Sequence, residues 1–331
     1  MATFVETMDD MWISTWREQK KEVVDNIFDA TPFYFWMKKK GRMTEDYTGG
    51  EYLTVPLLRG RNDTVSMYTK GGSFAISQTN KLDVARYDWK YMGCSLVRYW
   101  IDEKINRGRA KIISKMQVEL DVAKLSMIEK LEEYLFGDGT DDSGRAFNGL
   151  DIICVEDPTA AITTAHGSNA EEVGGIAQLS NDWWRNVYRD MDTDGPVVSL
   201  NMMESWKYAF REAKNGNDKP DIFVTTDQIL DWYDDECLDI KAIVNKTLGD
   251  AGFENLTWRG LPIITSPSCK SGSLYMLNTK YLNWVAQAGA NFDMTEWKVA
   301  PDTLDRYAQI VVSGNLVTSK RKAHAVVFDI D

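Results

Sequence analysis

The most regular hydrophobic pattern in this chain is a helical stripe between Asp102 and Phe136. Apolar residues recur there at spacings of three, four or seven positions, and they are Ile105, Ile112, Met116, Leu120, Ala123, Met127, Leu131 and Leu135. These spacings place the side chains on one face of a helix, while Lys, Arg and Glu fill the other faces. With Asp102 as a cap and Gly137 as the end, we predict a helix of about 35 residues, roughly 52 Å long. No second matching helix follows and strands flank the stripe, so a single helix along a sheet is favoured over a coiled coil.

Residues 51–100 alternate between apolar and polar side chains, most cleanly in Arg86-Tyr87-Asp88-Trp89-Lys90-Tyr91. A period of two predicts strands. Alternation also flanks the segment Lys70-Gly71-Gly72, through Val65 and Met67 before it and Phe74 and Ile76 after it. We therefore predict a long hairpin whose double glycine supplies the positive φ of the turn. An isolated two-stranded hairpin is only marginally stable, so one that reaches out needs a surface to lie against, and in an assembly a neighbour supplies it.

Residues 1–48 are unusually rich in aromatic and methionine side chains. A helical spacing of three or four positions links Phe4, Met8, Met11, Trp12 and Trp16, which indicates an amphipathic helix. After Pro32, four aromatic residues follow without a break from Phe33 to Trp36, a run too apolar for a loop in water and too short for a core helix. Two interpretations remain open. The segment packs onto its own domain, or it contacts another subunit, as exposed aromatic clusters do at interfaces.

The rest of the chain mixes helices and strands. The pattern predicts helices at 179–191 and 200–214 and around Ile229 to Trp232. It predicts strands at 222–224, 260–264, 274–277, 307–312 and 323–330, with the last two on either side of Gly314. No fixed-period repeat or low-complexity linker is present, so the expected fold is α+β with interleaved subdomains.

Composition excludes several classes of protein. The chain has 331 residues, of which 44% are hydrophobic and 11% aromatic, and this content is typical of a folded core. It has 50 acidic and 38 basic residues, a net charge of −12, which argues against a mainly electrostatic nucleic-acid binder. The N-terminus has no signal-peptide pattern, and the longest apolar runs are far shorter than the ~18–20 residues that cross a bilayer. The four cysteines are widely spaced without a CxxC pair, which favours reduced thiols in a cytoplasm.

Motifs for catalysis or cofactor binding are missing from the sequence. It has no phosphate-binding loop, dinucleotide fingerprint, nucleophile elbow or HExxH motif, and the glycines at 137, 139 and 144 indicate a turn. His166 and His324 lie far apart, and the aspartates at 138–142 and 190–194 lack the closing glutamate of a calcium loop. We therefore expect no catalytic, cofactor or metal site. A carbohydrate-active enzyme with two catalytic carboxylates is a distant alternative, but no spacing picks out such a pair.

The order of these elements resembles one family across nearly the whole chain. An aromatic arm, an extended hairpin, a solitary long helix, a compact α/β part and closing strands follow one another as in tailed-bacteriophage major capsid proteins of the Hong Kong-97-like fold. In this resemblance, residues 1–48 form the N-terminal arm, 49–97 the extended loop and 98–144 the peripheral domain with its spine helix. Residues 145–286 form the axial domain, and 287–331 form the return strands of the peripheral domain.

Short local matches support the resemblance. They are Phe147-Asn148-Gly149-Leu150 after the long helix, the strands at 221–226 and 260–264 with a further strand at Tyr275, and the ending 314–324. Many members carry a helical scaffolding segment before the arm, whereas here the arm begins almost at Met1, which implies a separate scaffolding protein or none. Some relatives join subunits through a loop lysine and a neighbour's asparagine. Lys70 and Lys81 lie in the loop, but no asparagine matches, so no crosslink is predicted.

The resemblance implies a structural protein, not an enzyme, that self-assembles as pentamers and hexamers into an icosahedral phage head. The implied partners are copies of itself, a portal, possibly a decoration protein, and loosely enclosed double-stranded DNA, with no membrane and no cofactor. The implied location is the virion capsid, assembled in the bacterial host cytoplasm. Candidate subunit-interface residues are Trp12, Trp16, Phe33, Trp36, Lys70, Gly71, Gly72 and Phe74. The basic run Lys320-Arg321-Lys322 faces DNA, an acidic neighbour or simply solvent. The alternative function is an encapsulin-like shell around protein cargo.

Overall fold

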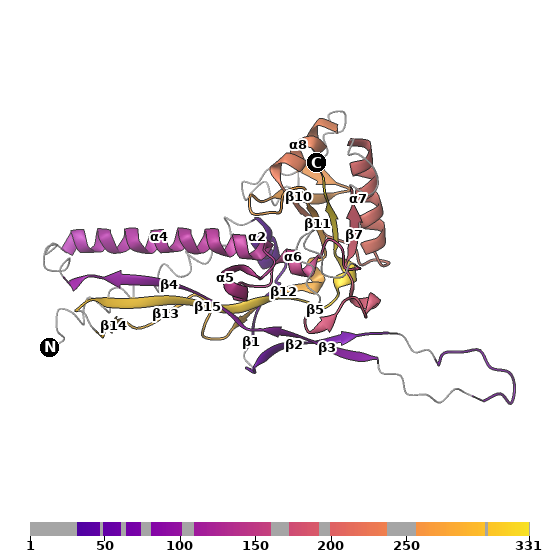
Figure 1. Ribbon diagram of the computed structural model, residues 1–331, viewed down its shortest axis with the longest axis horizontal. Helices are drawn as coiled ribbons and strands as arrows, with labels where there is room; N and C mark the ends of the chain where they lie inside the picture. The colour runs from indigo at the N-terminus through magenta and orange to yellow at the C-terminus, as the bar shows by residue number, and fades with distance from the viewer. Residues whose placement is uncertain are drawn as a thin grey trace.

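A long horizontal part, an upright part and a projecting loop make up the computed structural model (Figure 1). The structure describes residues 32–46, 49–60, 64–73, 81–100, 109–159, 172–191, 199–236, 256–301 and 304–330. The predicted amphipathic helix with Trp12 and Trp16 lies outside these residues, as does Phe74.

The horizontal part consists of the helix α4 (Arg109–Phe136) lying along a six-stranded sheet (Figure 1). Its central strand β15 (Arg306–Thr318) pairs antiparallel with β4 (Lys90–Arg98) and β12 (Leu282–Gln287). The short strands β13 (Asp293–Met294) and β14 (Lys298–Val299) also pair with β15, and β1 (Met43–Asp46) pairs parallel with β12. The single helix packed along a sheet, as predicted from the apolar stripe, is confirmed.

The stripe of α4 is buried wherever its side chains are described. Leu120, Ala123, Met127, Leu131 and Leu135 are each exposed by 4% or less. The helix ends where predicted, and its last hydrogen bond runs from the Gly137 amide to the Glu133 carbonyl 3.1 Å away. The chain then turns into α5 (Asp141–Gly144) and α6 (Leu150–Ile153). The predicted start at Asp102 lies outside the described residues.

The upright part is built on a second six-stranded sheet in the order β7-β16-β11-β8-β10-β9. These strands are β7 (Val187–Asp190), β16 (Ala325–Phe328), β11 (Leu274–Leu277), β8 (Ile222–Thr225), β10 (Leu261–Thr265) and β9 (Leu256–Trp258). Helices α7 (Ser199–Ala213) and α8 (Asp227–Glu236) share one hydrophobic core with one face of the sheet, and the other face meets the core around α4. All four residues of β8 are therefore buried, as expected for a strand covered on both faces.

The projecting part is an antiparallel hairpin of β2 (Tyr52–Leu58) and β3 (Leu82–Asp88), with a long connection beyond it (Figure 1). The small pair β5 (Glu172–Val173) and β6 (Ile176–Ala177) and the 3₁₀ turn η1 (Asp182–Trp184) supply the residues that cover its buried face. The hairpin is confirmed. Its paired strands end at residue 58 and begin again at residue 82. The prediction that Val65 and Met67 lie in a strand was therefore wrong.

Three further sequence predictions were wrong. The aromatic run after Pro32 looks too short for a core helix in sequence, yet it forms the helix α2 (Pro32–Lys39), whose described aromatic side chains belong to the main core, as in the intramolecular interpretation. The predicted helix at 179–191 is instead η1 followed by β7, because residues 187–190 pair with β16. Gly314 does not separate two strands: it lies inside β15, where a Cβ would stand 2.7 Å from the Val285 carbonyl oxygen of β12. Glycine at position 314 allows β15 and β12 to approach each other closely.

His324 is a core residue whose ring is held in its neutral form. Its Nδ1 accepts a hydrogen bond from the Asn278 amide at 3.2 Å, and Nε2 lies 3.2 Å from the Thr318 hydroxyl. Burial, assisted by the charge of Arg321, lowers the pKa of His324 to about 3.

The buried His324 is expected to make folding stability depend on pH. The unfolded chain binds a proton below pH ~6.5 while the folded chain does not, so this group should cost about 1.4 kcal/mol per pH unit as the pH falls from ~6.5 towards ~3. Denaturant unfolding of the wild type and His324→Asn between about pH 4 and pH 7 measures this. The variant keeps a polar side chain without the titration, and parallel stability curves for the two proteins would contradict the prediction.

Candidate interaction surfaces

Metal ligands and thiol groups are the first candidates for a functional site in the described residues. No cluster of three or more His, Cys, Asp or Glu side chains among them could hold a metal ion. No helix in this part of the chain is long and apolar enough to cross a membrane. Cys94, Cys154 and Cys269 are free thiols, and burial raises the pKa of Cys154 and of Cys269 to about 12. These two thiols are therefore protonated near neutral pH and are poor nucleophiles.

The tip of the projecting loop exposes apolar side chains to solvent. Val65 is 83% exposed and Met67 is fully exposed, while Tyr68 is 64% exposed. The chain reverses in a turn in which the Gly72 amide donates to the Thr69 carbonyl at 2.8 Å, and Gly71 has φ +87°. Glycine is required there because that positive φ is unfavourable for other residues. The predicted glycine turn is confirmed.

The hairpin beneath this tip has a buried inner face and an outer face that is apolar near the tip. Its inner face is buried, and the Tyr87 hydroxyl donates to the Thr318 carbonyl of β15 at 3.1 Å. Its outer face carries two cross-strand pairs of exposed residues, Pro56 with Val84 and Leu58 with Leu82. Leu58 is 76% exposed and Leu82 69% exposed. We call these four residues the outer apolar face. A contiguous apolar patch on an extended hairpin is typical of a surface that another molecule covers.

The predicted interface residues fall into two groups in the structure. Lys70, Gly71 and Gly72 are exposed at the loop tip. Phe33 and Trp36 are only 1% and 5% exposed, because they pack into the core of their own chain; the Phe33 ring lies 6.0 Å from that of Phe136. For these two side chains the structure shows the packing expected from the intramolecular interpretation, and it leaves a neighbour little surface to contact.

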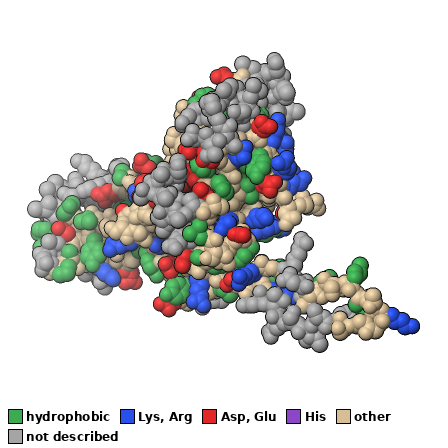
Figure 2. Space-filling model, turned by 45° about the vertical axis from the view of Figure 1, so that its right-hand side comes forward, with side chains coloured by type: hydrophobic (Ala, Val, Ile, Leu, Met, Phe, Trp, Pro, Cys, Tyr) green, Lys and Arg blue, Asp and Glu red, His purple; other side chains and the backbone are tan. Residues whose placement is uncertain are grey.

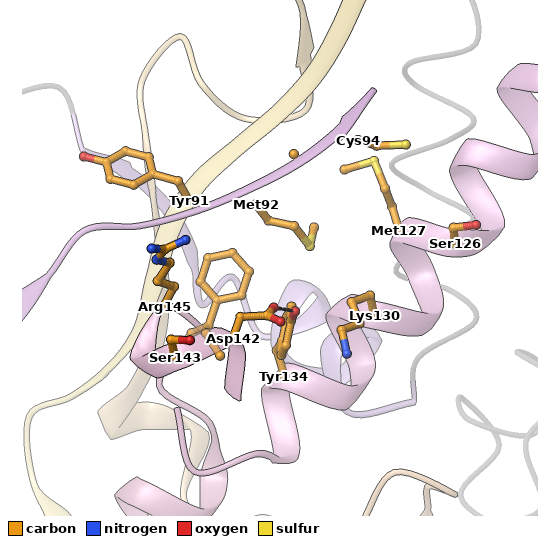
Figure 3. Close-up of a pocket in the computed structure, with 13 residues that line it drawn as sticks. Tyr91, Met92, Cys94, Ser126, Met127, Lys130, Tyr134, Asp142, Ser143 and Arg145 are labelled. Atoms are coloured by element: carbon orange, nitrogen blue, oxygen red, sulfur yellow. Dashed lines mark hydrogen bonds between the residues drawn. The ribbon is translucent and has the colours of Figure 1, made fainter. Parts of the chain in front are cut away.

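A groove follows the space between α4 and β4 (Figure 3). One part of it has a volume of about 610 Å³, and a second cavity of about 290 Å³ shares Cys94 and Ser126 with that part. The Tyr134 hydroxyl donates to the Asp142 carboxylate, and burial together with this bond raises the pKa of Tyr134 to about 12. Met92 and Met127 lie on the apolar wall. Tyr134 is therefore a neutral phenol near pH 7, and the groove combines it with the thioethers of Met92 and Met127.

This groove could not be found from the sequence. Its walls come from β4, α4 and α5, which meet only in the folded chain, and the contributing residues carry no motif. The single available signal was the alternation around Tyr91, which predicted a strand but not what faces it.

The basic run Lys320-Arg321-Lys322 is not the uniform surface patch that the sequence indicated. Arg321 is 0% exposed, and in the described part of the chain its guanidinium donates to neutral oxygens of residues 152–186. Lys320 lies 5.0 Å from the ring centre of Tyr281 and 4.0 Å from the Asp218 carboxylate, and Lys322 is exposed. Arg321 therefore cannot contact DNA or a neighbouring chain, because the fold encloses it.

Comparisons with known proteins show which solved structures share this architecture. No protein-family model and no curated protein matches the chain. Among solved structures, the capsid asymmetric unit of cyanophage A-1(L) has a TM-score of 0.62 at 14% identity, covering 87% of this chain and 90% of that one. An empty GTA particle capsid has a TM-score of 0.52 at 8% identity, covering 87% and 88%. The holo-SrpI encapsulin complex from Synechococcus elongatus has a TM-score of 0.50 at 11% identity, covering 89% and 87%.

These likenesses define the class of the fold. The chain has the α+β capsid-protein fold found in phage capsids, and an encapsulin shell shares it. The fold class expected from the sequence and the resemblance to phage capsid proteins are both confirmed at the level of the fold.

Proposed function

We propose that this chain is a major capsid protein of the Hong Kong-97-like type, which assembles as pentamers and hexamers into a closed icosahedral shell. The observation that carries the proposal is the outer apolar face, set on a projecting hairpin of a chain with the capsid-protein fold. A lone subunit leaves this face in water, whereas a neighbour in a shell covers it. Closed symmetry then leaves no such surface unpaired.

The domain assignment follows from the same proposal. The horizontal part with α4 corresponds to the peripheral domain, the upright part to the axial domain, and residues 49–97 to the extended loop. In this assignment, 1–48 is the arm, 98–144 and 287–331 belong to the peripheral domain, and 145–286 is the axial domain. β4, β12 and β16 do not follow these bounds, because β4 and β12 lie in the sheet of the horizontal part and β16 lies in the upright sheet. The exposed candidates Lys70, Gly71 and Gly72 then lie where the loop reaches a neighbouring subunit.

The proposed content of the shell is double-stranded DNA, held loosely in a virion that is assembled in the host cytoplasm with a portal and scaffolding or decoration proteins. The net charge of −12 supports loose enclosure, because a wall that binds phosphates tightly would oppose both packaging and release. The likeness to an encapsulin supports protein cargo as the second candidate. Particles purified from the native source distinguish the two: nuclease-protected DNA supports the first, and copurified enzymes in DNA-free shells support the second.

Substituting the outer apolar face is expected to prevent assembly without unfolding the subunit. Burying one leucine contributes about 1.5–3 kcal/mol, so Leu58→Ser with Leu82→Ser should raise the concentration needed for assembly by roughly tenfold or more. Light scattering and negative-stain imaging compare the particles with the 37.7 kDa monomer, and thermal unfolding monitors the fold. Thr54→Ser, on the same exposed face, is the matched control. If the wild type stays a monomer even with scaffolding protein supplied, the proposed function is wrong.

A further inference from the structure

The outward face of α7 carries a basic strip. Lys207 and Arg211 are exposed on this helix, Lys214 is exposed just after its end, and Glu204 and Glu212 lie among them. The Arg211 side chain is 71% exposed and only loosely paired, since its Nε lies 3.9 Å from the Glu212 carboxylate. Figure 2 shows Lys and Arg side chains gathered on one side of the upright part. The strip therefore presents positive charge that its own helix does not fully neutralise.

An aromatic side chain stands between two arginines in this strip. Tyr208 is 38% exposed, and its ring centre lies 4.8 Å from the guanidinium carbon of Arg189 on β7 and 5.5 Å from that of Arg211. Stacking on the ring holds both guanidinium groups in place. Fixed guanidinium groups lose less side-chain entropy when they bind a carboxylate than free ones do.

The outward face of α8 carries the opposite charge. This helix has the sequence DQILDWYDDE and contains no lysine or arginine. Asp227, Asp231 and Asp235 are exposed and Asp234 is half-buried. Counting Arg189, the α7 strip has four bases and two acids, a net charge of +2, whereas these four aspartates carry −4.

The two helices lie toward different ends of one sheet. α7 packs on β7 and β16, at the start of the strand order, and α8 packs on β10, near its end, while the two helices also contact each other on the same side of the sheet. In a ring of identical copies each contact is heterologous, so one face of a subunit meets a different face of the next. Such a contact requires two complementary faces on the same chain, and α7 and α8 supply them.

We propose that the basic α7 strip of one subunit docks against the acidic α8 face of a second copy around the ring of a pentamer or hexamer. This inference rests on the proposed function and names the surfaces that the ring would use. A polyanion is the less favoured ligand of the α7 strip, because glutamates interrupt the strip and the whole chain is acidic.

Charge reversal on both faces tests the contact. Lys207→Glu with Arg211→Glu places acid against acid, and Asp231→Lys with Asp235→Lys places base against base. Each double variant is expected to lower the assembled fraction roughly tenfold at low ionic strength, because like charges at an interface repel. The chain with all four changes restores complementary charge in the swapped order and is expected to assemble within about twofold of the wild type.

The control and the contrary outcomes are well separated. Lys298→Glu with Lys322→Glu makes the same change in net charge at exposed sites off both helices, and it should assemble normally. Thermal unfolding shows whether each variant is folded. If Lys207→Glu with Arg211→Glu does not fold, Lys207→Gln with Arg211→Gln takes its place. Normal assembly of either reversed variant, failure of the four-change chain, or equal loss in the control would overturn the docking. If the wild type itself forms no shell, the proposed function fails instead.

Discussion

Arg321→Met is expected to destabilise the subunit by about 3–5 kcal/mol, because it removes a buried cation whose hydrogen-bonding groups are all engaged. Nε donates to the Ile153 carbonyl at 2.9 Å, and Nη1 donates to Gln178 Oε1 at 2.9 Å. Nη2 donates to Asn186 Oδ1 at 3.0 Å. Two further bonds reach the Trp184 and Ile152 carbonyls. Methionine fills similar volume but leaves these acceptors buried without a donor.

The charge of Arg321 is costly to bury, so the destabilisation measured in Arg321→Met shows how far its hydrogen bonds offset that cost. Its five hydrogen bonds to described residues go to neutral oxygens, and burial lowers the pKa of Arg321 to about 10, so the side chain is still protonated at neutral pH. Its role is to join α6 to residues 178–186, which reach the projecting hairpin through Trp184.

Urea unfolding of the unassembled subunit measures the loss at Arg321. Arg321→Lys keeps the charge with fewer donors and should fall between the wild type and Arg321→Met. Lys322→Met, at the exposed neighbouring position, is the matched control and should stay within about 0.5 kcal/mol of the wild type. A loss below about 1 kcal/mol in Arg321→Met would show that the guanidinium contacts contribute little.

Phe33→Ala and Trp36→Ala should each destabilise the folded subunit by about 3–5 kcal/mol, because each removes a large side chain from the core. Phe33 packs against Phe136 at the end of α4, and the next residue, Tyr34, packs edge-on against Trp284 of β12 at 6.1 Å. The helix α2 therefore joins the long helix to the sheet of the horizontal part. An interface role predicts something different: a fully stable subunit that does not assemble.

Trp36→Phe provides the matched control for this position. The indole nitrogen of Trp36 is buried and has no hydrogen-bond partner in the described part of the chain, so phenylalanine loses packing volume but no hydrogen bond. We expect a cost of about 1 kcal/mol, well below that of alanine. Thermal and urea unfolding measure stability, and light scattering measures assembly. Wild-type stability in Phe33→Ala together with lost assembly would restore the interface interpretation.

Local sequence patterns were sufficient to predict an element where one of its faces is buried and the other is exposed to solvent. The stripe from Leu120 to Leu135 predicted the described part of α4 and its buried side, because only the helical period aligns those residues. Alternation around Tyr87 predicted β3, and the double glycine predicted the turn at Gly71. The order of these elements was enough to identify the fold by resemblance.

The same patterns failed where distant segments decide. The run from Phe33 to Trp36 has no apolar-polar period, so only contact with Phe136 and Trp284 shows that it is a core helix. Residues 187–190 form a strand because β16, more than a hundred residues later, offers them an edge. Tertiary pairing overrides a weak local preference in such a segment.

The sequence by itself determined the long helix, the hairpin with its glycine turn, the α+β class and the absence of familiar catalytic motifs. Only the tertiary structure decided which charged and aromatic residues are accessible. Arg321 lies between two lysines and looks solvated in sequence, yet oxygens of residues 152–186 enclose it. Leu58 and Leu82 look like core strand residues, yet they remain exposed. Burial depends on which segments meet in space, and the periodicity of one segment does not show which other segments cover it.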